Sequence, residues 1–225
     1  MQYDGIIFDL DGTLWDSSEE IQFSWGEVLK QQPDIPALPS RETLESVMGL
    51  GAEELTEKLF PYLSRERRLE IFDLCAVYEC AYLTQHGAKL YPKIRETLAA
   101  LSAEHPLFIV SNCADGYIQS FLTAHDTARY IRDFECIGRT GKPKSENIRL
   151  IVERNGLRNP VYVGDTQWDY EAATAAGVPF IFAAYGFGRV ENTPKIDAPA
   201  ELFDLLHGEK DAEPDSPDAA CEENR

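Results

Sequence analysis

The fold of this chain is constrained most by a set of short, continuous apolar runs that are separated by helix-like stretches. The first run, residues 3–10, contains Ile6-Ile7-Phe8, and similar runs occur at 107–110, 161–163 and 180–182. Continuous apolar runs are typical of parallel strands that are buried on both faces. Strands that alternate with helices predict an α/β fold, in which helices cover both faces of a parallel sheet.

A long helical insertion separates the first predicted strand from the second. Residues 15–88 have helical periodicity and no good strand, and the segment is far longer than an ordinary connection. We therefore expect an all-helical cap domain at 15–88 and an α/β core domain at 1–14 and 89–207. Residues 208–225 are acidic and nearly free of large apolar side chains, which predicts a disordered acidic tail.

Composition narrows the classes of partner and location. The formal net charge of -18 argues against binding to nucleic acid or to an anionic membrane. Five cysteines with no Cys-x-x-Cys spacing suggest neither a disulfide framework nor a zinc site. No run approaches the roughly 18 apolar residues of a membrane span, and residues 1–10 do not resemble a secretion signal. We expect a cytoplasmic protein that is a monomer or a weak homodimer.

A motif rich in carboxylates follows the first strand: Asp9-Leu10-Asp11-Gly12-Thr13-Leu14. Asp-Gly commonly closes hairpins, but the flanking residues do not alternate as hairpin strands do. A carboxylate at the end of a buried strand lies where open parallel sheets bind ligands. Asp11, two residues on, can reach the same pocket.

The strand followed by Asp-x-Asp-Gly-Thr-Leu resembles the first signature of the haloacid dehalogenase-like hydrolase superfamily. Three later segments resemble its other signatures in order: Ser111-Asn112 after a strand, Lys142 in Gly141-Lys142-Pro143, and Gly164-Asp165-x-x-x-Asp169. The helical insertion is similar to the caps of phosphoglycolate phosphatase and beta-phosphoglucomutase relatives. This resemblance spans nearly the whole chain apart from the tail, and it implies a Rossmann-like core.

Two lysines are candidates for the lysine of the third signature. A fixed ammonium group at a phosphoryl oxygen offsets the charge that develops during transfer. The position after Gly141 favours Lys142, and Lys144 is its rival. Ser145 stands two residues after Pro143, where the family often has a proline.

Four carboxylates are expected in one pocket: Asp9, Asp11, Asp165 and Asp169. Such crowding is electrostatically costly unless a cation is present. Mg²⁺ is the expected cofactor because it prefers oxygen ligands and keeps several waters. The resemblance implies that the metal is held by Asp9, the backbone carbonyl of Asp11 and Asp165, with Asp169 ligating directly or through water.

The resemblance also implies a mechanism. Asp9 attacks phosphorus to form an aspartyl phosphate, and Asp11 protonates the departing alcohol and later activates water. The phosphoryl group is positioned by Thr13, Ser111, Asn112 and Lys142. Within the cap, Met48-Gly49-Leu50-Gly51 is a candidate specificity loop, and Arg41 and Lys58 are candidates to reach a second anionic group.

The sequence therefore predicts a Mg²⁺-dependent phosphatase that acts on a small phosphorylated metabolite and resembles phosphoglycolate phosphatase. Asp11 argues against a dehalogenase, because a halide leaving group needs no proton. Two alternatives stay open. One is a phosphomutase of the beta-phosphoglucomutase type, and the other is a non-catalytic phosphate-binding protein.

Overall fold

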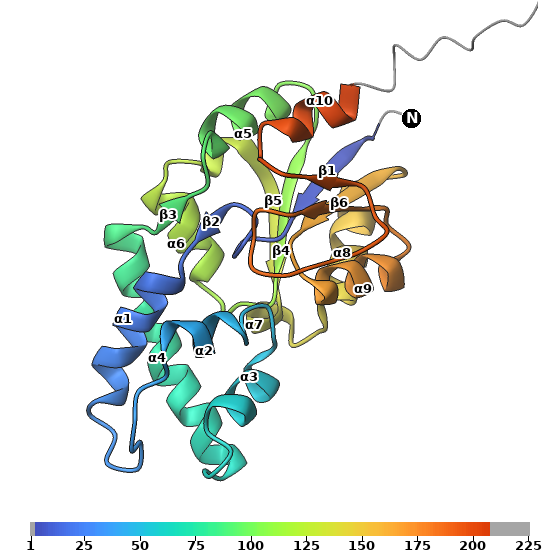
Figure 1. Ribbon diagram of the computed structural model, residues 1–225. Helices are drawn as coiled ribbons and strands as arrows, with labels where there is room; N and C mark the ends of the chain where they lie inside the picture. The colour runs from blue at the N-terminus through green and yellow to red at the C-terminus, as the bar shows by residue number, and fades with distance from the viewer. Residues whose placement is uncertain (1–2, 208–225) are drawn as a thin grey trace, which may run out of the picture.

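The computed structural model describes residues 3–207, and the predicted tail at 208–225 lies outside them (Figure 1). The main sheet is parallel and has the strand order β5-β4-β1-β6-β7-β8. Its strands are β1 (Gly5–Phe8), β4 (Leu107–Ser111), β5 (Ile131–Cys136), β6 (Pro160–Gly164), β7 (Phe180–Ala183) and β8 (Lys195–Ile196). The predicted α/β fold is confirmed, and β5 and β8 are two further strands that were not predicted from the sequence.

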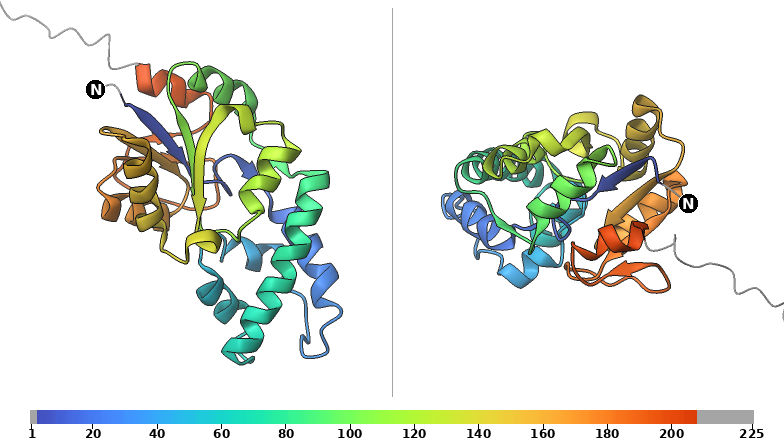
Figure 2. Two further views of the ribbon diagram at one scale, coloured as in Figure 1. Left: turned by 180° about the vertical axis from the view of Figure 1, so that it is seen from behind. Right: turned by 90° about the horizontal axis from the view of Figure 1, so that it is seen from above.

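Helices cover both faces of this sheet, and the alternation of side chains along β1 shows why. Ile6 and Phe8 belong to a core cluster that includes residues from three helices on one face, whereas Ile7 belongs to a second cluster with two helices on the other. The first face carries α5 (Ile94–Ser102), α6 (Tyr117–Ala124) and α10 (Glu201–His207), and the second carries α8 (Lys144–Asn155) and α9 (Gln167–Ala176). Figure 2 shows these layers from behind and from above.

The predicted helical insertion is present and lies beyond the carboxyl ends of the central strands (Figure 1). It leaves the core through β2 (Trp15–Asp16) and returns through β3 (Lys89–Leu90), and these two short strands pair antiparallel. Its helices are α1 (Ser18–Leu29), α2 (Arg41–Glu45), α3 (Ala52–Leu59) and α4 (Arg65–His86). Because exit and return are adjacent, the insertion is attached to the core by one two-stranded connection.

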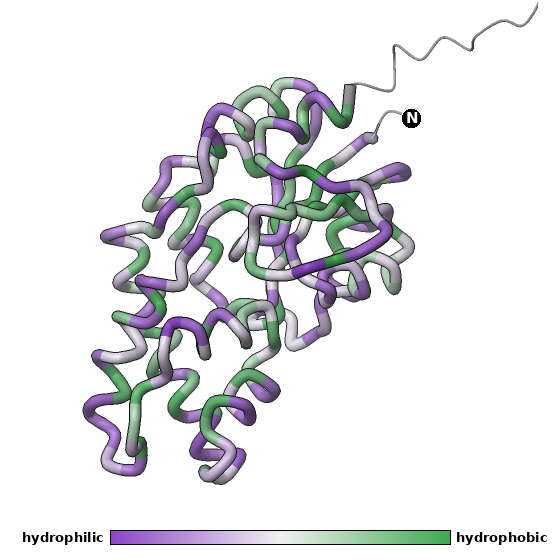
Figure 3. Tube along the Cα trace, in the orientation of Figure 1, coloured by the Kyte–Doolittle hydropathy of each residue, from purple (hydrophilic) through white to green (hydrophobic). Residues whose placement is uncertain are grey.

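Within the insertion, α1 packs on α4 through their apolar faces. Trp25 of α1 is buried and meets Phe72 of α4 edge to face, with ring centroids 6.1 Å apart. Figure 3 shows the alternation of polar and apolar residues along these helices. The helix α4 also contacts α6 of the core, where Thr84 Oγ1 donates a hydrogen bond to Ser120 Oγ at 2.9 Å. No helix within residues 3–207 has both the length and the apolar character needed to span a membrane.

Candidate active site

The site forms where three neighbouring strands of the main sheet end. Phe8 at the end of β1 lies opposite Ile109 of β4 on one side and Val163 of β6 on the other. The backbone N–H of Asp9 donates to the carbonyl of Val163 at 2.8 Å, so β1 keeps its pairing up to the first carboxylate. The segments that follow β1, β4 and β6 therefore meet at one edge, as expected for an open parallel sheet.

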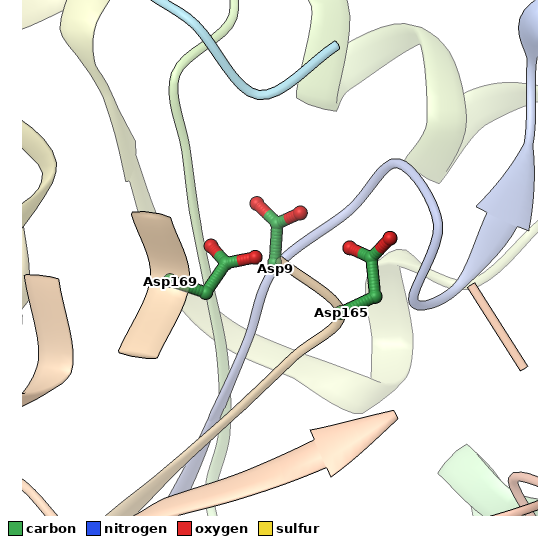
Figure 4. Close-up of side chains that lie close together, drawn as sticks. All are labelled: Asp9, Asp165 and Asp169. Carbon is green, nitrogen blue, oxygen red and sulfur yellow. The ribbon is translucent and has the colours of Figure 1, made fainter. Parts of the chain in front are cut away.

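Three carboxylates gather at this edge: Asp9, Asp165 and Asp169 (Figure 4). Each is buried, and each offers an oxygen within 4.8 Å of the others' oxygens. Asp169 is fixed by a capping box at the start of α9: the Thr166 N–H donates to Asp169 Oδ2 at 3.0 Å, and the Asp169 N–H donates back to Thr166 Oγ1. Thr166 Oγ1 also donates to Asp169 Oδ2 at 2.6 Å. A compact set of carboxylate oxygens is the donor chemistry that suits Mg²⁺.

Burial and mutual repulsion make it unfavourable for the carboxyl groups of this cluster to be charged at the same time. Burial first, and then the charge of Asp169, raise the pKa of Asp9 to about 7, although the Lys144 ammonium acts in the opposite direction. Burial, Asp169 and Asp9 together raise the pKa of Asp165 well above its ordinary value. The N–H of Phe187 partly offsets this rise by donating to Asp165 Oδ2 at 2.7 Å. The carboxylates can thus share one pocket when positive charge is placed among them.

The protein supplies one such charge through Lys144, not through Lys142. The Lys144 ammonium is buried and donates to Asp9 Oδ1 at 2.7 Å and to Asp169 Oδ1 at 2.6 Å. Burial lowers the pKa of Lys144, but the Asp169 and Asp9 carboxylates more than offset this effect and the net shift is upward. Lys144 therefore stays charged beside the acidic cluster.

The structure does not bring Lys142 to the pocket. Its side chain is about half exposed and lies 3.7 Å from the exposed carboxylate of Glu146. The helix α8 begins at Lys144 after Pro143, so the first residue of the helix enters the site. Lys142 precedes that helix, and its carbonyl accepts a hydrogen bond from Asn147 Nδ2. Of these two lysines, which are separated by a single residue, the structure brings Lys144 and not the predicted Lys142 to the acidic cluster.

Asp11 stands apart from the acidic cluster and is held by other partners. Its Oδ1 accepts hydrogen bonds from Trp15 Nε1 at 2.8 Å, from Tyr117 OH at 2.7 Å and from Ser17 Oγ. Burial raises the pKa of Asp11, and these three donors oppose the rise. A carboxyl group with a raised pKa is suited to proton transfer. Tyr117 had no signal in the sequence, because it reaches Asp11 across 106 positions of the chain, whereas Ser17 lies only six residues after Asp11.

The remaining predicted residues also lie at this edge of the sheet. Ser111 and Asn112 line the same cavity as Asp9 and Asp11. Thr13 is buried, and its hydroxyl lies 3.5 Å from Asp165 Oδ1. Asn112 also connects core and insertion, because its Nδ2 donates to the carbonyl of Gly49 at 2.8 Å. The structure thus brings together every predicted site residue except Lys142.

Two glycines allow the backbone to approach Asp165. Gly12 has a φ of 81°, and a side chain there would collide with the Asp165 carboxylate. Gly186 faces the same aspartate, and a Cβ there would overlap Asp165 as well. The segment around Gly186 follows β7. It supplies the Phe187 N–H to Asp165 and is part of the site.

Comparison with known proteins agrees with this fold. The family model described as haloacid dehalogenase-like hydrolase matches residues 6–183. Phosphoglycolate phosphatase from Yersinia pseudotuberculosis is 32% identical over 198 residues, covering 81% of this chain and 82% of the relative. Phosphoglycolate phosphatase from Escherichia coli K12 is 28% identical over 210 residues, with the same coverage of each chain.

A solved structure supports the same assignment at the level of the fold. The crystal structure of a predicted phosphoglycolate phosphatase from Haemophilus somnus has a TM-score of 0.80 and 24% identity, covering 91% of this chain and 98% of that one. The family model spans the strand ends that build the acidic cluster, and the Yersinia relative covers 81% of the chain. This chain belongs to the haloacid dehalogenase-like hydrolase family, in the branch that resembles the phosphoglycolate phosphatases.

Proposed function

We propose that this phosphatase hydrolyses small phosphate monoesters through a phosphorylated Asp9, with Mg²⁺ as its cofactor. The observation that carries the proposal is the placement of Lys144, whose buried ammonium group donates hydrogen bonds to both Asp9 and Asp169. A buried carboxylate beside a fixed ammonium can receive a dianionic phosphoryl group that would otherwise be repelled. The phosphatase names of the relatives agree with this chemistry.

Asp9 and Asp11 divide the reaction into two steps. An oxygen of Asp9 bonds to phosphorus while the bond from phosphorus to the alcohol oxygen breaks, and Asp11 donates its proton to that oxygen. Asp11 then removes a proton from the water that attacks the aspartyl phosphate, which releases inorganic phosphate and restores Asp9. The raised pKa of Asp11 supports its role as the acid in the first step.

Mg²⁺ fits the donor set at the strand ends. Asp9, Asp165, Asp169 and the backbone carbonyl of Asp11 would hold the ion, and its charge would stabilise both the carboxylates and the phosphoryl oxygens. Ser111, Asn112 and Thr13 are proposed to orient the phosphoryl group by hydrogen bonds. Lys144 takes the role that the sequence analysis gave to Lys142.

The insertion is proposed to act as a cap domain at 15–88 over a core domain at 1–14 and 89–207. The hydrogen bond from Asn112 to Gly49 supports this role, because it ties the specificity loop to the phosphoryl end of the site. A closed cap excludes bulk water during attack by Asp9. A cytoplasmic location and a monomer or weak homodimer stay predictions.

Phosphate release from p-nitrophenyl phosphate tests the proposal. The purified protein is expected to hydrolyse this ester with Mg²⁺ and to lose activity after addition of EDTA. Asp9→Asn removes the nucleophile and is expected to lower kcat by at least about 10³-fold. Circular dichroism should show that the variant is folded.

Two results would contradict this function. Turnover that survives Asp9→Asn without Mg²⁺ would exclude the aspartyl phosphate. Conversion of beta-glucose 1-phosphate to glucose 6-phosphate, without release of phosphate, would instead identify a phosphomutase.

A further inference from the structure

A cavity of about 80 Å³ lies between the core and the insertion, next to the proposed nucleophile. Asp9 and Asp11 border it from the core, and Trp25 of α1 and Glu79 of α4 border it from the insertion. A phosphoryl group on Asp9 would place its leaving alcohol in this space. The cavity has room for several waters or for a short organic chain. Its walls therefore determine which alcohols fit.

Most of these walls are apolar. Much of the apolar surface comes from side chains of the insertion, among them Ile21, Leu44, Met48, Leu50, Leu55 and Phe72. Such a surface favours methylene groups and disfavours unpaired charge. The alcohol that binds here is accordingly expected to have a short hydrocarbon chain.

No lysine or arginine is among the lining residues of this cavity in the described part of the chain. The two cations considered from the sequence are engaged elsewhere: Arg41 pairs with Asp16 at 3.1 Å and with Glu45, and Lys58 lies over the ring of Trp168 and near Glu54. Lys144 is committed to Asp9 and Asp169. A carboxylate on the leaving group would thus be buried without a cationic partner, which is strongly unfavourable.

The insertion nevertheless places two polar groups in this apolar wall. Glu79 is 6% exposed and Trp25 is 4% exposed. The Trp25 indole N–H has no hydrogen-bond partner of normal geometry, and its interaction with the Glu79 carboxyl group acts to lower the pKa of Glu79. Burial and the charge of Asp11 outweigh that effect and raise the pKa of Glu79 to about 8, so the carboxyl group is largely uncharged at neutral pH. A buried donor without a partner is unusual and indicates a missing ligand.

We propose that Glu79 and Trp25 select leaving alcohols that carry a second hydroxyl group on a short apolar chain, and that the cavity rejects leaving groups with a second anion. This inference rests on the proposed phosphatase function. A hydroxyl group can accept from the Trp25 N–H and donate to Glu79 at once, whereas an ammonium group cannot accept. The substrate class thus differs from the phosphoglycolate that gives the relatives their name, since glycolate carries a carboxylate.

Four esters of similar size test this selection. Propyl, 3-hydroxypropyl and 3-aminopropyl phosphate and 3-phosphonooxypropionate differ only at the end of the chain, and p-nitrophenyl phosphate reports the basic activity. We expect kcat/KM for 3-hydroxypropyl phosphate to exceed that for propyl phosphate by about tenfold. The carboxylate ester should be poorer than propyl phosphate by tenfold or more, because its charge would be unpaired.

Substitution of Glu79 links the preference to this residue. In Glu79→Leu, the ratio of kcat/KM for 3-hydroxypropyl to propyl phosphate should fall close to one. Glu79→Gln keeps a hydrogen-bonding group of the same shape and should retain most of the preference. Glu66→Leu changes an exposed glutamate on the same helix and should leave the ratio as in the wild type. Thermal unfolding of each variant verifies that it is folded.

The outcomes separate this inference from the function on which it rests. If p-nitrophenyl phosphate is hydrolysed but the carboxylate or the amine ester is the best substrate, the hydroxyl selection is wrong while the phosphatase function stands. A hydroxyl preference that persists in Glu79→Leu would also overturn it. If none of the five esters releases phosphate, the proposed function fails and the inference fails with it.

Discussion

At the scale of single residues, the position of one ammonium group decides how the acidic cluster works. Lys144 lies within hydrogen-bonding distance of Asp9 and Asp169, whereas Lys142 faces solvent two residues earlier. The two lysines are therefore a matched pair, alike in chemistry and different in burial.

Substitution of each lysine by methionine tests this difference. Methionine keeps most of the side-chain volume and removes the charge. Lys144→Met is expected to lower kcat by about 10²-fold to 10³-fold, the usual cost of losing one preorganised electrostatic partner. Lys142→Met should change kcat less than twofold. Steady-state kinetics with p-nitrophenyl phosphate measures both, and the reverse order of effects would restore the original assignment to Lys142.

Glu79 gives a prediction about stability that is independent of activity. Its pKa is raised to about 8 in the folded protein from an ordinary value of 4.5. Between pH 4.5 and about 8, the folded state therefore keeps a proton that the unfolded state releases. The free energy of unfolding falls as pH rises through this range, because proton release favours the unfolded state. The loss amounts to about 5 kcal/mol at most, by the order-of-magnitude value of about 1.4 kcal/mol per pH unit.

Urea unfolding from pH 5 to pH 8 measures this effect as a difference between two proteins. The free energy of unfolding of the wild type should fall relative to that of Glu79→Leu as pH increases, since leucine has no proton to lose. Subtraction removes the common contributions of Asp9 and Asp165. A pH-independent difference between the two proteins would show that Glu79 is charged in the folded state.

At the scale of elements, the turn after β1 sets the distance between the first carboxylates and Asp165. Gly12 adopts a φ of 81°, and a methyl group there would strike the Asp165 carboxylate. Gly156 has a φ of 66° after α8, but a methyl group there would meet nothing within 4 Å. A comparison of these two sites therefore separates the effect of backbone strain from the effect of steric collision.

Alanine at each glycine should therefore give different results. Gly156→Ala is expected to cost about 1 kcal/mol of stability, as for a residue forced into the left-handed region, with kcat unchanged. Gly12→Ala carries the same strain and also displaces Asp165, so its kcat should fall by tenfold or more. Chemical unfolding and phosphate release measure the two quantities. Equal kcat values for both variants would contradict the close approach at Gly12.

The elements that could be predicted from the sequence are those whose own residues specify them. The continuous apolar runs of β1, β4, β6 and β7 identified the buried strands, and the polar residues after three of them identified the site edge. β5 was missed because it lies at an edge of the sheet and carries Arg132, Asp133 and Glu135. Two residues in β8 are too few for any pattern.

Sequence patterns could not show where α8 begins or which side chains meet across the fold. Whether Lys142 or Lys144 enters the site depends on where α8 begins. The helix begins at Lys144, and this lysine enters the pocket, whereas Lys142 precedes the helix and does not. Tyr117 reaches Asp11 over a separation of 106 residues. Glu79 and Trp25 meet only because α1 packs on α4, so neither residue had a signal in its own segment.

At the scale of the whole molecule, folding brings three buried carboxylates together against one ammonium group. Asp9, Asp165 and Asp169 come from segments separated by up to 160 positions along the chain, since 169 minus 9 is 160. Their assembly raises the pKa of Asp9 and of Asp165, so the fold without a metal is less stable when both groups must ionise. A divalent cation that binds only the folded state should stabilise it.

Thermal unfolding with MgCl₂ tests this coupling without any assay of activity. At a Mg²⁺ concentration about 100 times Kd, mass action adds about 2.7 kcal/mol, which raises Tm by several degrees in a chain of this size. The increase should be larger at pH 8 than at pH 6, because Mg²⁺ competes with protons for Asp9 and Asp165. Asp165→Asn removes one ligand and should abolish most of the increase, while NaCl at equal ionic strength controls for screening. An equal rise in Tm with NaCl, or in Asp165→Asn, would show that the acidic cluster does not bind the ion.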